Sequence, residues 1–191
     1  MTEIILFPKI IKFIQYKKDL KTFIKEVNLI KKKYPEGGHN WYDTNKVYNT
    51  NGTYNLYENK KFKPLLKWID NCVKEYCEKL QVHSNMYLKN AWLNIYKKNQ
   101  GQEYHDHNTS SISAIFFLKG SVKSAKVLFT DFNNKINLKI KNYIDINSTV
   151  WKVPFSEGTL IIFRADTVHG VEQHLLNEER ISIAINYIIK K

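Results

Sequence analysis

The sequence of 191 residues is poor in cysteine, proline, glycine and arginine, and it contains no long apolar run. A membrane-spanning helix needs about 20 consecutive apolar residues. The closest stretch, Ile4 to Ile14, is interrupted by Pro8, Lys9 and Lys12, so we expect no membrane span. The chain also starts with an early acid, Glu3, and no small-residue cleavage site follows the stretch, so we expect no secretory signal peptide.

Cysteine is represented only by Cys72 and Cys77, which are five residues apart. This spacing fits neither a CxxC redox pair nor a zinc knuckle. Two thiols without a disulfide framework are typical of a reducing compartment. Both cysteines lie in a helix-like apolar stretch, so we expect them in the core.

Arginine is scarce although the chain is strongly basic. Lys and Arg number 30 against 18 Asp and Glu, a formal charge of +12, but only Arg164 and Arg180 are arginines. A positive excess is typical of nucleic-acid-binding proteins, yet dedicated readers of phosphates and bases favour Arg. Abundant Lys, Asn and Ile also fit the compositional bias of an AT-rich genome. A Lys-rich nucleic-acid-binding module is therefore an alternative and not our leading hypothesis.

Apolar residues make up 43% of the chain, enough for a folded core, and they follow two patterns. The stretches Asp19–Lys33 and Phe62–Leu80 carry apolar residues at helical spacing. Between them, Pro35–Asn59 is rich in Gly, Asn, Thr and Tyr, which predicts a long loop with at most a short strand.

After Val82 the pattern changes to short β-branched and aromatic runs separated by turn residues. Six or more short strands favour a jelly roll or double-stranded β-helix. We therefore expect an α+β fold in a single domain, with helices and a loop over residues 1–81 and a cupin-like double-stranded β-helix over residues 82–191. The predicted strands are Trp92–Tyr96, Ile112–Leu118, Lys126–Phe129, Tyr143–Ile146, Thr159–Phe163 and Ile181–Ile189.

Three of the six histidines occupy positions that favour a metal site. His105 and His107 flank Asp106 just before one predicted strand, and His169 follows another. In extended backbone, residues two apart point to the same side, so the two histidines can face a barrel interior together. A third ligand from a later strand would leave coordination positions open, as an oxygen-activating iron requires. A His-x-His pair alone is also common on strands that bind no metal.

Arg180 stands just before the last predicted strand. Alternation places Arg180, Ser182, Ala184 and Asn186 on one face of the extended segment, and three isoleucines on the other. An inward-facing arginine is costly to bury unless an anion pairs with it. A carboxylate ligand held by the guanidinium and a nearby hydroxyl is the explanation that we favour.

The order His-x-His, His, Arg-x-Ser resembles that of the iron(II)/2-oxoglutarate-dependent oxygenases. The chain is most similar to an oxygenase branch of that superfamily that is common in phages and aquatic bacteria. The segments that carry this resemblance occur in the same order along the chain. They are Leu6-Phe7-Pro8, Trp92-Leu93-Asn94, Gly101, His105–His107, Gly158–Phe163, His169-Gly170-Val171 and Glu179–Asn186.

The resemblance implies a dioxygenase that uses Fe(II), 2-oxoglutarate and O2 to hydroxylate a C–H bond, with conversion of 2-oxoglutarate to succinate and CO2. It implies that His105, His107 and His169 bind Fe(II) as neutral imidazoles and form the catalytic centre. It also implies that Arg180, aided by Ser182, binds the distal carboxylate of 2-oxoglutarate.

Asn94 and Tyr96 share one face of the strand before the His-x-His pair. They are candidate contacts to the cosubstrate, and a packed core pair is the alternative. Other conspicuous side chains are expected to be structural: Arg164 exposed, and Trp92, Phe117 and Trp151 in the core. The histidines that we do not expect to bind metal are His39, His83 and His174.

One departure from the family concerns the second ligand. Most 2-oxoglutarate oxygenases carry His-x-Asp, whereas this chain has His107 at that position. Asp106 would coordinate only if the strand bulged. Without a carboxylate ligand the iron would carry more positive charge, so a non-catalytic, cupin-like metal- or ligand-binding protein is a second hypothesis.

The substrate is predicted only as a peptidyl or prolyl side chain or a small molecule. We expect neither a nucleic acid nor a membrane as partner, and the sequence predicts no oligomeric state. The redox argument and the resemblance together predict the cytoplasm of a bacterium or of a phage-infected host.

Overall fold

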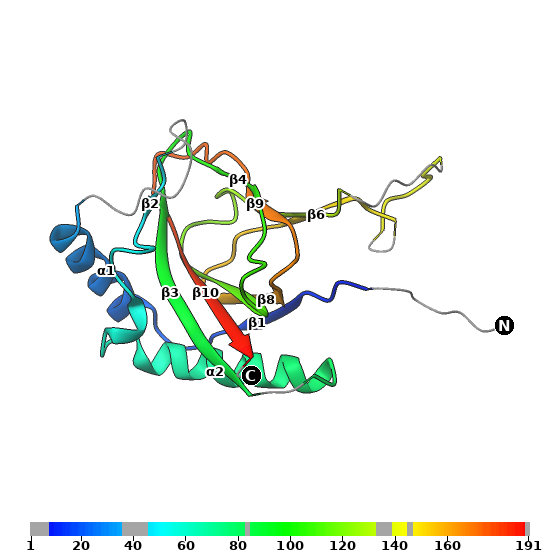
Figure 1. Ribbon diagram of the computed structural model, residues 1–191. Helices are drawn as coiled ribbons and strands as arrows, with labels where there is room; N and C mark the ends of the chain where they lie inside the picture. The colour runs from blue at the N-terminus through cyan, green and yellow to red at the C-terminus, as the bar shows by residue number, and fades with distance from the viewer. Residues whose placement is uncertain (1–7, 36–45, 83–84, 133–138, 145–146, 190–191) are drawn as a thin grey trace.

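The computed structural model describes residues 8–35, 46–82, 85–132, 139–144 and 147–189. In these residues two antiparallel sheets face each other, and two helices cover the outer face of the larger sheet (Figure 1). The predicted class, a double-stranded β-helix with N-terminal helices, is confirmed. No helix in the described part is both long and apolar enough to cross a membrane.

Both predicted helices are present, with bounds close to the expected ones. Helix α1 (Lys21–Lys33) ends in three lysines, whose charge is favourable at a helix C-terminus. Helix α2 (Lys63–Lys79) has a proline in its first turn, where the missing N–H costs nothing. Each buries one apolar stripe, and that of α2 includes Cys72 and Cys77, which are free and buried as predicted.

The large sheet has six strands in the order β1-β8-β5-β10-β3-β2, and every pairing is antiparallel. The small sheet has four strands in the order β4-β9-β6-β7. A short 3-10 helix, η1 (Leu56–Glu58), packs against β3. The strands are β1 (Lys12–Gln15), β2 (Tyr48–Asn49), β3 (Met86–Tyr96), β4 (Gln102–His105), β5 (Ile112–Lys119), β6 (Val127–Thr130), β7 (Val150–Val153), β8 (Thr159–Arg164), β9 (His169–Val171) and β10 (Arg180–Ile189).

Side-chain alternation along β10 divides the core into two clusters. Ile181, Ile183 and Ile185 face the helices and join the larger cluster. The opposite face of the large sheet, with Phe117 and Phe163, packs against the small sheet. The predicted alternation of β10 is therefore confirmed, and it turns the polar residues of this strand toward the space between the sheets.

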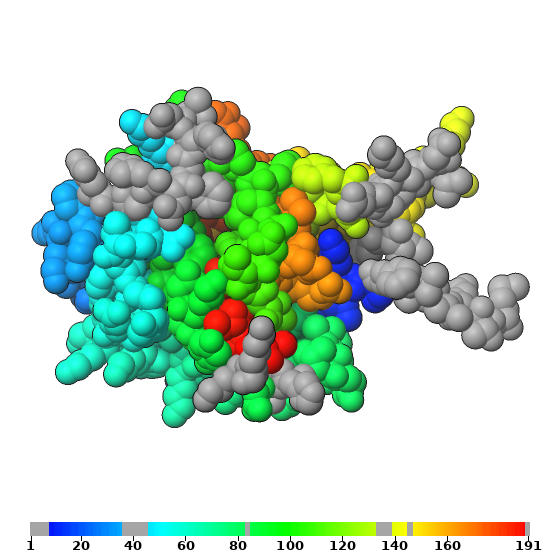
Figure 2. Space-filling view, in the orientation of Figure 1, coloured from blue at the N-terminus to red at the C-terminus, as the bar shows by residue number. Residues whose placement is uncertain are grey.

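Two predictions for the segment before Pro154 were wrong, namely the strand at Tyr143–Ile146 and the core position of Trp151. Tyr143 and Ile144 are in no strand, because none of the described strands pairs with them, and residues 145–146 lie outside the described part. Residues 139–144 stand apart from the body of the molecule, on the side away from α1 (Figure 2). The strand begins instead at Val150. Trp151 is 44% exposed and not in the core, because β7 is the edge strand of the small sheet.

Candidate metal centre

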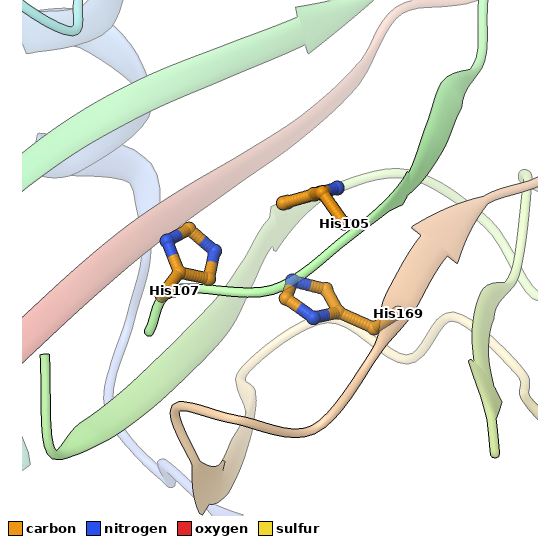
Figure 3. A group of neighbouring side chains, drawn as sticks. All are labelled: His105, His107 and His169. Atoms are coloured by element: carbon orange, nitrogen blue, oxygen red, sulfur yellow. The ribbon is translucent and has the colours of Figure 1, made fainter. Parts of the chain in front are cut away.

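The structure brings His105, His107 and His169 together. His105 ends β4 and pairs in register with His169, the first residue of β9. His107 follows two residues later, where its backbone N–H donates to the Ala165 carbonyl at 2.8 Å. The three rings turn toward a common space (Figure 3), and one ligand atom from each lies within 4.8 Å of the others.

Backbone carbonyls orient two of the three rings. Nδ1 of His105 lies 2.8 Å from the Glu103 carbonyl, and Nδ1 of His169 lies 2.9 Å from that of Thr167. A carbonyl oxygen can only accept, so in each case Nδ1 carries the proton and donates. Nε2 of both rings then carries a lone pair and no proton, as a metal ligand requires.

The protein environment favours neutral imidazoles. Burial lowers the pKa of His105 and lowers that of His169 well below its ordinary value. Burial, followed by the neighbouring His105, lowers the pKa of His107 to about 4. Neutral imidazole is the form that binds metal, so the site does not have to expel protons from these rings near neutral pH.

Asp106 does not belong to this group. Its side chain is exposed, and its Oδ1 accepts a hydrogen bond from the Asn108 backbone N–H at 3.2 Å. The strand does not bulge in the way that would turn Asp106 inward. Among the described residues the ligand set is three imidazoles without a carboxylate.

Three neutral imidazoles suit iron as well as other first-row metals. Bonds from imidazole nitrogen to such metals are about 2 Å long, so small rotations of the rings would bring the three atoms within reach of one ion. Three ligands from one side leave further coordination positions open toward the space between the sheets. The residues present therefore fit a metal with open positions.

A pocket lined by the three histidines lies between the two sheets. Arg180 lies at this pocket, and its side chain is completely buried. Its Nε donates to the Ala125 carbonyl at 2.9 Å, and Nη1 donates to the Ser182 hydroxyl at 3.2 Å. Nη2 is buried and has no hydrogen-bond partner among the described residues.

Aromatic rings surround the guanidinium of Arg180. Its central carbon lies 4.7 Å from the ring centre of Tyr96, 5.4 Å from that of Phe117 and 5.1 Å from that of Phe155. No acid forms an ion pair with Arg180 in the part of the chain that the structure describes. Burial lowers the pKa of Arg180, as expected where no counter-ion is near. The arrangement can accept an anion in the pocket.

The remaining predicted site residues also line this pocket. Ser182 is buried opposite Asn94 in the β10–β3 register. The Asn94 side chain has a buried Oδ1 that has no hydrogen-bond partner in the part of the chain that the structure describes. The Tyr96 hydroxyl donates a hydrogen bond to Oε1 of Gln102 at 2.7 Å, a contact that the sequence did not reveal. Tyr96 is thus both a pocket residue and a ring that packs on Arg180.

Trp92 and His174 show features that the sequence did not reveal. Trp92, assigned to the core, also lines the pocket, and its ring centre lies 5.9 Å from that of His107. His174 is completely buried and structural: its Nδ1 accepts from the Ala125 N–H, and Nε2 lies 2.7 Å from the Glu178 carbonyl. Arg164 is exposed as predicted and pairs with Asp166. His39 and His83 lie outside the described residues.

Several solved structures have a similar fold. The α-ketoglutarate-dependent epimerase SnoN from nogalamycin biosynthesis superposes with a TM-score of 0.69 at 13% identity, over 94% of this chain and 76% of SnoN. A prolyl-4-hydroxylase from Pseudomonas putida superposes with a TM-score of 0.62 at 12% identity, over 94% of this chain and 92% of the hydroxylase chain. HygX from Streptomyces hygroscopicus, crystallised with nickel and 2-oxoglutarate, superposes with a TM-score of 0.63 at 13% identity, over 94% of this chain and 83% of HygX. At these identities the likeness shows the fold alone.

No protein of curated function matches the sequence. The family described as "Putative 2OG-Fe(II) oxygenase" matches residues 90–186, about half of the chain. This span includes the three histidines, Arg180 and Ser182. The chain therefore belongs to the 2OG-Fe(II) oxygenase family, whose cofactor is iron and whose cosubstrate is 2-oxoglutarate.

Proposed function

We propose that this oxygenase is an Fe(II)- and 2-oxoglutarate-dependent hydroxylase. The observation that carries the proposal is the buried Arg180, which has no acidic partner among the described residues and shares one pocket with three convergent histidines. A buried cation without a counter-ion is costly, and a dicarboxylate that also reaches the metal would offset that cost.

In this proposal His105, His107 and His169 hold the metal through three ring nitrogens. When bound, Fe(II) with 2-oxoglutarate and O2 supplies the oxidative decarboxylation to succinate and CO2 that drives hydroxylation of a C–H bond. The histidines would contribute as three neutral donors and would leave coordination positions open for the cosubstrate and O2.

Arg180 and Ser182 have the role of binding the distal carboxylate of 2-oxoglutarate. Nη2 of Arg180 has no hydrogen-bond partner among the described residues, and Nη1 of the same guanidinium donates to the Ser182 hydroxyl. Charge-assisted hydrogen bonds from a guanidinium fork are stronger than neutral ones. Asn94, with an unpartnered Oδ1 in the same pocket, is assigned to a second polar contact with the cosubstrate, and Tyr96 to shaping its place.

Apolar side chains keep water from the inner side of the metal centre. The ring centre of Phe163 lies 4.8 Å from that of His169, and the ring centre of Phe129 lies 5.9 Å from it. A dry wall of this kind strengthens electrostatic interactions at the site and limits side reactions. We assign both phenylalanines to this role.

The substrate class stays a prediction: a peptidyl or prolyl side chain, or a small molecule. Similar folds occur in the Pseudomonas putida prolyl-4-hydroxylase and in the epimerase SnoN, so this fold serves both classes. The single domain over residues 1–191 and the cytoplasmic location likewise stay predictions.

Turnover without added substrate tests the proposal. We expect Fe(II)-loaded protein to convert 2-oxoglutarate slowly to succinate when O2 is present, and His169→Ala to abolish this. Arg180→Leu should abolish it as well. If wild type binds iron and 2-oxoglutarate but forms no succinate with or without a substrate library, the non-catalytic metal- and ligand-binding protein is the better account. The absence of a carboxylate in the ligand set is the observation that favours this second candidate.

A further inference from the structure

The three histidines differ in how their second ring nitrogen is held. Backbone carbonyls fix His105 and His169, as described above. His107 has instead a side-chain partner: Nδ2 of Asn186 lies 3.3 Å from its Nδ1. The other end of the same amide, Oδ1, accepts a hydrogen bond from the Ser113 hydroxyl at 2.8 Å.

The fold fixes this contact. Asn186 and Ser113 are direct partners in the β10–β5 register, and both are buried, with 5% and 2% exposure. The register between β10 and β3 shifts immediately after Asn186, where β3 carries one extra residue, Lys89, and the alternation of β10 continues. Tyr187, the next residue, joins the cluster that faces the helices. Water has little access to replace either partner.

The direction of the Asn186 amide decides whether His107 can bind metal through Nε2. With Nδ2 toward the ring, the amide donates to Nδ1, and Nε2 must then carry the ring proton. A half-turn of the amide keeps the same heavy-atom positions and exchanges the two ends. Oδ1 then accepts from Nδ1–H of His107, Nδ2 donates to the Ser113 hydroxyl, and Nε2 presents its lone pair.

We propose that Asn186 positions His107 for metal binding by accepting the Nδ1–H hydrogen bond through Oδ1, with Ser113 holding the other end of the amide. Asn186 is thus a positioning residue that acts through His107. It does for the third ligand what the Glu103 and Thr167 carbonyls do for the other two. The inference rests on the proposed function, because it presumes that all three histidines bind the metal.

The test uses Zn(II), a diamagnetic metal that imidazole binds well, and long-range 1H–15N spectra of the histidine rings in the full chain. We expect Zn(II) to shift Nε2 of His105, His107 and His169, and to leave a proton on Nδ1 of each. The His105 and His169 signals serve as internal references, because their Nδ1–H partners are backbone carbonyls. Ligation of His107 through Nδ1, or no shift of its ring on Zn(II) binding, would overturn the proposal.

Variants separate positioning from stability. Asn186→Leu removes the acceptor at similar volume, and we expect Zn(II) affinity, measured by chelator competition, to fall about 10- to 100-fold. Asn186→Asp can only accept, so it should keep the Nδ1–H form of His107 and recover most of the affinity. Asn90→Leu, which removes the amide across from Asn186 on β3, is the control and should leave affinity unchanged.

The outcomes distinguish the two claims. If Zn(II) shifts the signals of all three histidines and the Zn(II) affinity of Asn186→Leu equals that of wild type, the role of Asn186 is refuted but the metal site stands. No shift of any of the three rings refutes the metal site and this inference together. If Asn186→Leu fails to fold in a thermal melt, Ser113→Ala gives the second measurement. It frees the amide to rotate, so a weaker Zn(II) site is expected, and unchanged affinity contradicts the proposal.

Discussion

The guanidinium of Arg180 lies 4.7 Å from the ring centre of Tyr96, and Tyr96 is held in turn by its hydrogen bond to Gln102. The cation is completely buried, and its hydrogen-bond partners are the Ala125 carbonyl and the Ser182 hydroxyl. Burial raises the pKa of Tyr96 to about 12, and the nearby Arg180 opposes this increase. Tyr96 therefore stays neutral, and the charge of Arg180 is available to a ligand.

Replacement of Arg180 by leucine should abolish the binding of 2-oxoglutarate and spare the metal. A hydrogen bond to a charged group contributes about 1.5–3 kcal/mol, and at least two are lost, so we expect affinity to fall about 100-fold or more. Calorimetric titration of 2-oxoglutarate into anaerobic, metal-loaded protein measures the change. Arg164→Leu, which removes the exposed arginine paired with Asp166, is the matched control. Equal affinity of wild type and Arg180→Leu would remove Arg180 from the site.

The identity of the second ligand is tested by a pair of variants. Asp106 is exposed and outside the group of three, so Asp106→Asn should leave metal affinity within about twofold of wild type. His107→Gln removes one of three donors and should weaken metal binding by a factor of at least about 100. Competition with a chromogenic chelator gives both affinities. The reverse order of the two effects would make Asp106 the ligand.

The elements that the sequence predicted are those with a strong repeating pattern. Helices α1 and α2 follow from the spacing of their apolar residues, and β10 from its alternation of isoleucine with smaller or polar residues. Strands β4 and β9 are four and three residues long and contain Gln102, His105 and Gly170, so they carry little strand pattern. They form because they pair with each other across more than 60 residues of chain.

The residues that line the pocket could be predicted from the sequence, and the contacts that support them could not. His105, His107, His169 and Arg180 follow from residue type and spacing. The contact of Asn186 with His107 depends on register between strands far apart in sequence, which periodicity does not fix. The buried, structural His174 was hidden for the same reason.

Gly170 permits the close approach of β9 to β4 beside the metal centre. A Cβ atom at this position would lie 2.9 Å from the Gln102 carbonyl oxygen, which is backbone and cannot move aside easily. Gly170→Ala should therefore lower the free energy of unfolding by about 1–3 kcal/mol and weaken metal binding, because His169 and His105 would separate. Urea unfolding and chelator competition measure the two effects.

Gly158→Ala is the control for this prediction. Gly158 has a φ of 80° and lies against Gln15 and Tyr16, away from the histidines. This substitution should also destabilise the protein, but metal affinity of the folded fraction should not change. A Gly170→Ala variant that binds metal as tightly as wild type would contradict the importance of the β4–β9 spacing.

Lowering the pH should destabilise the metal-free protein more than protonation of its carboxylates alone would. Burial lowers the pKa of His107 to about 4 and also lowers that of His105 and His169. In the unfolded chain these rings take up protons near their ordinary pKa of about 6.5. Between about pH 6.5 and 4 the unfolded state thus binds more protons, and the free energy of unfolding falls as the pH decreases.

The measurement is the urea midpoint at about pH 7.5 and about pH 5.5, chosen so that most carboxylates stay ionised. We expect a lower midpoint at the lower pH, and a smaller difference in His107→Gln. The same pH dependence in the variant and in wild type would show that His107 does not titrate as described.

The central claim is that one pocket binds iron through the three histidines and 2-oxoglutarate through Arg180. Anaerobic addition of Fe(II) and then 2-oxoglutarate, followed by visible absorption, tests it most directly. We expect a weak charge-transfer band in wild type that is absent in His169→Ala and in Arg180→Leu, while Arg164→Leu retains it. A folded, iron-loaded wild-type protein without this band in the presence of saturating 2-oxoglutarate would contradict the account.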